Sequence, residues 1–346
     1  MSREVQLCQS CELDYFYVIA RYHGVAFPGH EKFALQFFRE HGVLPLSVEC
    51  PNCKKDLVYR EDRHQWYCNT SVRVPRVKKR RRCGYVVSDF KGSFLDGTHL
   101  PAWKLLLFAN HFVRKIWNHQ TVLNSLELSP NTSVDWRSFC SEITEYAFDN
   151  QQPIGGPGVI VEIDESHFGK RKYDRGRPLS DIWVFGGIER ESKASFIIPL
   201  VDPLPRERTA ANLLPLITKY IKAESVIISD KWRAYNKLAE LGYVHKTINH
   251  SDNFVDPDDP TVHTQNIERL WRDVKEWMKR PGNRSVYFRQ YLSRYLFIRK
   301  YPKDQVLHYF FKTASLLDPP QGERQRPQRP HEQEEEEEEQ RSNSNF

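Results

Sequence analysis

The sequence predicts an α/β fold, a mixed five-stranded sheet with flanking helices, preceded by a cysteine-rich segment and a helical segment. Three observations support this prediction. Between 157 and 248, five short apolar runs and two helical patterns follow one another as strand, strand, strand, helix, strand, helix, strand. Two of the runs, 159–164 and 225–230, are rich in β-branched residues and end in a carboxylate. Upstream, four cysteines lie between 50 and 83, and three helical patterns follow between 98 and 150.

Length and charge limit the kind of protein this can be. The chain has 346 residues, room for two or three domains, because domains usually hold roughly 100–200 residues. The formal net charge is +6, but the segment from Gln321 onward carries eight Glu and four Arg, a charge of −4, which leaves +10 on the rest. A basic body favours a polyanionic partner, most simply nucleic acid. General basic solubility is the alternative.

We expect neither a membrane span nor a secretory signal. No run of about 18 apolar residues occurs, and the apolar stretch 15–20 is short and follows Glu12 and Asp14. The seven cysteines are therefore expected to be thiols or metal ligands and not disulfides.

Residues 45–92 predict a zinc ribbon-like domain. Cys50 and Cys53 form a Cys-x2-Cys knuckle, and Cys68 and Cys83 are the candidate second pair. Zn2+ takes four soft ligands at tetrahedral corners, and binding it would supply folding free energy to a segment with few core residues. The fourteen residues between Cys68 and Cys83 would leave the site and return as a loop. Free structural thiols are the alternative.

The two ends of the chain are expected to be accessory. Residues 1–44 form an N-terminal segment with one short helix near 33–38. Cys8 and Cys11 have knuckle spacing, but no second pair follows within about 35 residues, so a zinc site there is the less favoured interpretation. Residues 319–346, with a run of Glu at 334–339, predict a disordered acidic tail.

Two segments are candidates for DNA contact. Residues 98–150 resemble a helix-turn-helix, in which a capped last helix enters the major groove; generic helical packing fits nearly as well. A basic run also lies between the last two cysteines: Lys78, Lys79, Arg80, Arg81 and Arg82. Such a run could contact phosphates or direct nuclear import, and a solvated loop is the third interpretation.

Residues 157–318 carry the candidate chemistry. Asp164 and Asp230 each end a predicted strand, and Glu268 lies beside the apolar stripe of a predicted helix. Mg2+ prefers carboxylate oxygens, and two such ions about 3.5–4 Å apart can activate a nucleophile and stabilise the leaving oxygen of a phosphodiester. We therefore expect Asp164, Asp230 and Glu268 to converge and hold Mg2+ or Mn2+. For a single Asp, a solvated strand end is the alternative.

Together these motifs resemble the Merlin superfamily of DNA transposases, relatives of bacterial insertion-sequence transposases. The resemblance spans about 50–302 and rests on the four cysteines and on three stretches. These stretches are Val161-Glu-Ile-Asp164-Glu-Ser, Ile228-Ser-Asp230-Lys-Trp-Arg-Ala-Tyr235 and His263-Thr-Gln-Asn-Ile-Glu268-Arg-Leu-Trp271.

The resemblance implies a zinc-ribbon and helical DNA-binding front and an RNase H-like catalytic domain. Its Asp-Asp-Glu triad would be Asp164, Asp230 and Glu268. The implied reaction is hydrolytic cutting at transposon ends, followed by attack of the freed 3′-hydroxyl on target DNA, in the nucleus and by a homo-oligomer. The long gap before Cys83 and the acidic tail depart from the family pattern.

Neighbours of the triad have competing interpretations. Alternation along the strand is expected to send Glu162 and Glu165 away from Asp164, with Glu165 more simply a solvated charge than a supplement to the site. Trp232 and Tyr235 could stack on an unpaired base, but core packing is favoured. A basic loop follows the first strand and is expected to bind the DNA backbone: Lys170, Arg171, Lys172, Arg175 and Arg177.

Two functions of different classes fit these features. The first is a metal-dependent DNA transposase. The second is a domesticated DNA-binding protein that keeps the fold and has lost mobility. An RNase H-like repair nuclease would explain the triad but not the zinc-plus-helical front.

Overall fold

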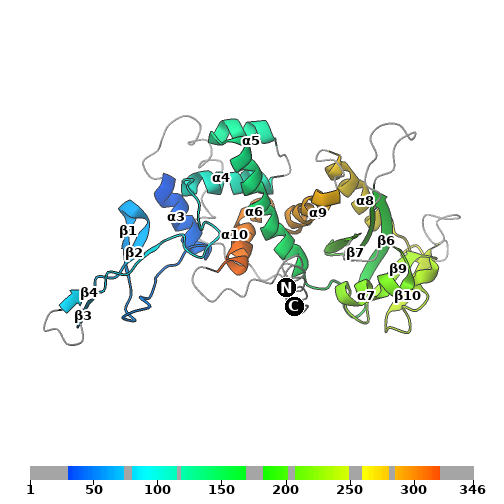
Figure 1. The fold of residues 1–346 in the computed structure, drawn as a ribbon. Helices are drawn as coiled ribbons and strands as arrows, with labels where there is room; N and C mark the ends of the chain where they lie inside the picture. Colours follow the sequence, from blue (N-terminus) through cyan, green and yellow to red (C-terminus); the bar gives the residue numbers. More distant parts are fainter. Residues whose placement is uncertain are drawn as a thin grey trace, which may run out of the picture. The chain divides into compact units, whose positions relative to one another are not determined.

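A computed structural model describes residues 30–73, 80–114, 118–168, 182–201, 207–248, 259–279 and 285–319. The chain divides into two compact units (Figure 1). The first comprises 1–137 and 304–346, and the second comprises 138–303. None of the helices in the described ranges combines the length and apolar character needed to cross a bilayer.

Two small sheets form the cysteine-rich part of the first unit. β1 (Val58–Arg60), β2 (Gln65–Tyr67) and β5 (Val86–Ser88) make an antiparallel three-stranded sheet with β2 in the centre. β3 (Ser71–Arg73) and β4 (Arg80–Arg82) pair as a separate two-stranded ribbon. Trp66 of β2 is buried against the cysteines. Few other apolar side chains are buried here, which agrees with a fold that depends on a metal.

Helices form the rest of the first unit, and their bounds are α3 (His30–Glu40), α4 (Ala102–Val113), α5 (His119–Leu126), the start of α6 (Pro130–Asp149) and α10 (Val306–Leu317). The three helices predicted between 98 and 150 are therefore present. Asn118 caps α5 by accepting a hydrogen bond from the Thr121 amide at 3.0 Å. Ser129 accepts one from the Thr132 amide at 3.1 Å and so begins α6.

The second unit is built on a five-stranded mixed sheet, and its strands are β6 (Ile160–Phe168), β7 (Ile182–Glu189), β8 (Ser195–Leu200), β9 (Val226–Asp230) and β10 (Val244–Ile248). Their order is β10-β9-β6-β7-β8. β7 is antiparallel to both of its neighbours, whereas β9 and β10 run parallel to β6. This order and these directions define an RNase H-like sheet, as predicted. Pro199 is tolerated in β8 because that strand lies at the edge.

Helices cover both faces of this sheet. On one face, Val161 and Ile163 of β6 pack in a core with α7 (Ala210–Tyr220). On the other, Phe168 packs in a core with α8 (Gln265–Met278) and α9 (Ser285–Lys300). Each fully buried Leu, Ile or Phe side chain contributes about 1.5–3 kcal/mol. The central strand β6 is thus fixed from both sides.

Candidate active site

The structure brings Asp164 and Asp230 to the same level of two neighbouring strands. β6 pairs with β9 in parallel, with Glu162 opposite Ile228. Two residues further along both strands, the same register sets Asp164 level with Asp230. Residues at one level of two parallel strands point to the same face, so both carboxylates are expected on one face of the sheet. Both residues are half-buried.

Trp271 of α8 holds the carboxylate of Asp164. Its indole Nε1 donates a hydrogen bond to Asp164 Oδ2 at 2.9 Å. Gly186 of β7, the cross-strand partner of Asp164, makes room for the indole. A Cβ on Gly186 would lie 2.6 Å from Trp271 Cη2, closer than such atoms approach. The sequence alone assigns neither residue a role, although a Gly pair inside a strand is typical of close approach by another group.

Glu162 anchors the beginning of α8. Its Oε2 accepts hydrogen bonds from the amides of Asn266 and Ile267 at 2.8 and 3.1 Å. Thr264, the residue before the helix, makes no side-chain capping bond, so a strand carboxylate satisfies the free N–H groups in its place. The expectation that Glu162 points away from Asp164 is wrong. Side chains two residues apart share one face of a strand, and both carboxylates bind α8.

A buried ion pair completes the environment of Glu162. Arg190 donates to Glu162 Oε1 from Nε at 3.0 Å and from Nη2 at 2.8 Å. The Glu162 side chain is fully buried and that of Arg190 is 17% exposed. Arg190 also donates to the carbonyl oxygens of Thr261 and His263, at 2.6 and 3.0 Å. The start of α8 and the approach to it are therefore held by one strand carboxylate and its arginine.

Glu268 lies exposed in the first turn of α8. It precedes Trp271 by three residues, and residues at that spacing are neighbours on a helix surface. The structure does not gather it with Asp164 and Asp230 into one ligand set. Within the described ranges, only the four cysteines form a group of three or more ligand atoms within 4.8 Å of one another. The triad thus stays a prediction, supported by two level strand ends and a helix tied to one of them.

Glu165 lies on the opposite side of β6, as alternation predicts, but it is not a solvated charge. Its side chain is only 4% exposed. It accepts a hydrogen bond from the buried Tyr235 hydroxyl and lies 3.7 Å from Nη1 of Arg208. Burial raises the pKa of Glu165 to about 7, and the charges of Asp164 and Asp230 raise it as well. Core packing is confirmed for Tyr235 but is wrong for Trp232, which is 42% exposed.

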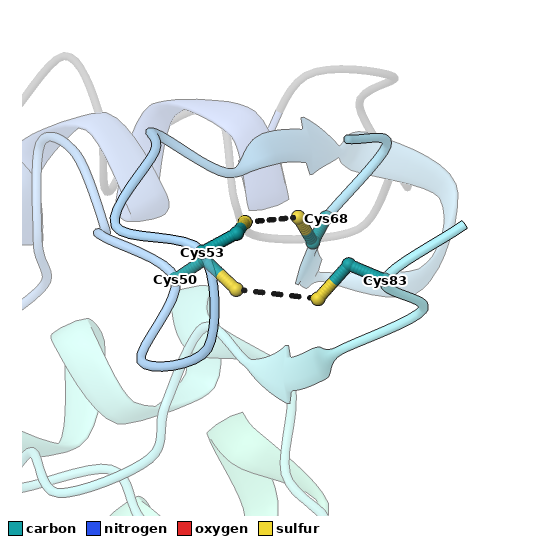
Figure 2. Close-up of side chains that lie close together, drawn as sticks. All are labelled: Cys50, Cys53, Cys68 and Cys83. Carbon is teal, nitrogen blue, oxygen red and sulfur yellow. Dashed lines mark hydrogen bonds between the residues drawn. The ribbon is translucent and has the colours of Figure 1, made fainter. Parts of the chain in front are cut away.

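The four predicted cysteines come together in the first unit (Figure 2). Cys53 Sγ lies 3.2 Å from Cys68 Sγ, and Cys50 Sγ lies 3.6 Å from Cys83 Sγ. Four sulfurs bound tetrahedrally to Zn2+ at 2.3 Å would lie about 3.8 Å apart, so the cluster fits this ion. The long gap before Cys83 does not remove it from the site, because the β3–β4 ribbon leaves after Cys68 and returns at Cys83.

Proton sharing in this cluster also suits a metal. The pKa of Cys53 is raised to about 11, mainly by its hydrogen bond to Cys68. The pKa of Cys68 is lowered to about 6, mainly by a hydrogen bond with the Thr70 side chain. Thiolate is the form that binds a metal, and the lowered pKa of Cys68 favours it.

Some of the predicted DNA contacts can be placed. Arg80, Arg81 and Arg82 form β4 and are all exposed. Together β3 and β4 form a basic ribbon, which we call the β3–β4 arm (Ser71–Arg73 and Arg80–Arg82). The other predicted positions lie outside the described residues: Lys78, Lys79, Lys170, Arg171, Lys172, Arg175 and Arg177. Cys8, Cys11 and the acidic tail beyond 319 lie outside them too.

The segment that carries the strand-end carboxylates has known relatives. Residues 154–301 match the ISXO2-like transposase domain. The matched segment starts before β6 and ends just after α9, so it includes Asp164, Asp230 and Glu268. The similarity supports an Asp-Asp-Glu transposase family for the second unit. It does not single out the Merlin superfamily.

Solved structures with some likeness are viral integrases. The catalytic core domain of BIV integrase has a TM-score of 0.26 and 16% identity, covering 39% of this chain and 80% of its own. A simian T-cell lymphotropic virus intasome in complex with PP2A regulatory subunit B56 gamma has a TM-score of 0.27 and 13% identity, covering 51% and 67%. No curated protein matches the chain. The strand order and register of the second unit define its fold independently of these likenesses.

Proposed function

We propose that this protein is a metal-dependent DNA transposase that cuts at transposon ends and joins the freed 3′-hydroxyl to target DNA. One observation carries the proposal. The segment that matches a transposase domain places Asp164 and Asp230 at one level of adjacent central strands. A helix from the same segment brings Glu268 within one turn of the residue that binds Asp164.

Asp164, Asp230 and Glu268 would hold Mg2+ or Mn2+. When bound, the metal would activate the attacking oxygen and stabilise the leaving oxygen of the phosphodiester. The other residues of the site have positioning roles. The Trp271 indole fixes one oxygen of Asp164 and so orients its carboxylate. Glu162 fixes the start of α8 and with it the position of Glu268.

DNA would approach along the exposed side of α8. Glu268 is followed at helical spacing by Arg272, Lys275 and Lys279, and all four side chains are exposed. Residues four, seven and eleven positions apart lie along one side of a helix. A DNA strand whose phosphates contact this basic stripe would reach the carboxylates at one end of the stripe. In the first unit, the exposed arginines of the β3–β4 arm and the capped helices α5 and α6 are further candidates for DNA contact.

Two wider properties belong to the same proposal. Joining two transposon ends to one target requires at least two copies of the chain, so we propose a homo-oligomer on DNA. Access to chromosomal DNA requires nuclear localisation, for which the basic run 78–82 is the candidate import signal.

A strand-cutting assay with Asp164→Asn tests the catalytic proposal. The DNA would be the genomic sequence flanking the coding region, because a transposase gene lies between its own ends. In Mg2+ or Mn2+ we expect wild type to nick this DNA and Asp164→Asn to lose at least about 100-fold in rate, with DNA binding unchanged. Asp304→Asn, at an exposed position in the first unit, is the matched control and should cut like wild type.

Two outcomes would contradict this proposal. Cutting by Asp164→Asn at the wild-type rate would remove Asp164 from the catalytic set. Tight DNA binding without any cutting by wild type would favour the domesticated DNA-binding protein. One observation favours this second function: among the described residues, no three carboxylates lie close enough together to hold one ion.

A further inference from the structure

A row of planar groups starts on the sheet face opposite α8 and reaches Trp232, which lies beyond the carboxyl end of β9. The His167 and Trp183 rings, on cross-strand partners of β6 and β7, have centroids 4.8 Å apart. The guanidinium of Arg208 lies 3.6 Å from the centroid of Trp183 and 5.2 Å from that of Trp232. The Arg208 guanidinium thus lies over both indoles. We call His167, Trp183, Arg208 and Trp232 the aromatic ladder.

The two ends of the ladder differ in exposure. Trp183 is partly buried against the core of the α7 face. Trp232 is 42% exposed and is among the large apolar side chains that the core does not cover. An aromatic ring that lies near a cation and is open to solvent offers a surface on which another planar group can stack. The ladder therefore has one end available for a ligand.

This open end is tied to the candidate catalytic carboxylates. The Trp232 amide donates a hydrogen bond to Asp230 Oδ1 at 3.1 Å. On the other side, Arg208 lies 3.7 Å from Oε2 of Glu165, the residue next to Asp164. The backbone of Trp232 is thus joined to one candidate catalytic Asp, and the arginine beside its ring contacts the sequence neighbour of the other.

We propose that Trp232 is a stacking site for an unpaired base of the DNA end, next to the phosphate that is cut. The inference rests on the proposed transposase function and deepens it by naming the form of the substrate. An indole needs a free base face, which paired and stacked bases of a duplex do not offer, so the ligand is a locally unpaired strand. The positive charge of Arg208 favours the approach of a phosphate backbone to the same place.

Binding without cutting tests this proposal separately from catalysis. The full chain would be titrated, in Ca2+ in place of Mg2+, against a fluorescent oligo(dT) single strand and a blunt duplex of equal length. Trp232→Ala should weaken single-strand binding about tenfold, the order expected for loss of one base–aromatic stack, and leave duplex binding unchanged. Trp232→Phe should restore most of the affinity. Tyr287→Ala, which removes an aromatic side chain of similar exposure (41%), is the control and should change neither.

The outcomes separate the stacking site from the proposed function. Equal losses for single strand and duplex, or no loss for either, would overturn the stacking role of Trp232 while DNA binding itself stands. Failure of wild type to bind any DNA would overturn the transposase proposal and the stacking site with it. A spectroscopic signature checks the contact directly: the fluorescence of 2-aminopurine in the single strand should fall on binding to wild type and not on binding to Trp232→Ala.

Discussion

Glu162 is one side chain that joins the central strand to the helix carrying Glu268. Its carboxylate oxygens accept every hydrogen bond described for this side chain. The donors are the amides of Asn266 and Ile267, the Asn266 side chain and Arg190. A buried carboxylate is well placed among so many donors, since the helix N-terminus and the guanidinium both favour negative charge. Glu162 thus stabilises the fold and fixes the helix of the proposed active site.

Glu162→Gln should destabilise the protein by about 3 kcal/mol, because it leaves a largely buried arginine without its charge partner. The substitution also replaces one accepting carboxylate oxygen by an amide NH2 group, which would face the N–H donors around it. Urea unfolding would measure the loss. Glu276→Gln, at a side chain that is 70% exposed, is the control and should change stability by less than about 1 kcal/mol. Equal stability of the two variants would show that the Glu162 cap contributes nothing.

Gly186→Ala should impair the site through the contact between Trp271 and Asp164. The added Cβ would force the indole to move, and overpacking of this kind costs about 1–3 kcal/mol. We expect lower stability in urea and a slower cutting rate. Trp271→Phe separates the two effects, because it removes the indole N–H without introducing the clash, and it should slow cutting with a smaller loss of stability. Wild-type cutting by both variants would mean that this hydrogen bond is not needed.

At the scale of elements, the group of four cysteines gives the clearest prediction. The purified chain should contain one zinc ion, and Cys83→Ser should lose it because thiolate ligands hold the ion. Chelation should unfold the β1–β2–β5 sheet and change the fluorescence of Trp66, which is buried against the cysteines. Metal analysis and emission spectra measure both effects. Cys140→Ser, outside the cluster, should retain the zinc; loss of zinc by this variant as well would point to general unfolding.

The elements were more predictable than their contacts. β6 and β9 follow from β-branched runs that end in Asp, and α8 follows from apolar residues at helical spacing, since these patterns are local. The Asp positions and the four cysteines could be found for the same reason. Trp271, Gly186 and Arg208 could not, because their roles depend on which elements meet in space. The prediction for Glu165 is wrong because a Glu at a strand end is usually exposed. Here the hydroxyl of Tyr235, which is distant in the sequence, donates to it.

At the scale of the whole molecule, charge is divided between a basic body and an acidic tail. The segment from Gln321 carries −4, so its removal leaves a chain of +10. We expect the truncated protein to bind duplex DNA about two- to tenfold more tightly in about 50 mM salt, and the gain to shrink at about 200 mM as screening increases. Fluorescence anisotropy would measure both affinities.

A charge-neutral tail provides the control for that truncation. Replacing the four Glu at 336–339 by Gln keeps the length and brings the charge of the segment from −4 to zero. If charge is the cause, this variant should bind DNA like the truncated protein. Wild-type affinity in the substituted chain would assign the effect to the bulk of the tail.

The β3–β4 arm also has a use in protein engineering. Its two ends are fixed next to Cys68 and Cys83, and the Cys83 amide donates to the Thr70 carbonyl oxygen at 2.8 Å, which closes its base. A foreign hairpin or peptide tag spliced between Arg73 and Arg80, which pair with each other across the ribbon, would start and finish at neighbouring positions, so the rest of the domain would not have to adapt to its length. The Arg73–Arg80 pair is a graft point at which the DNA contacts that we propose for the arm could be exchanged as a module.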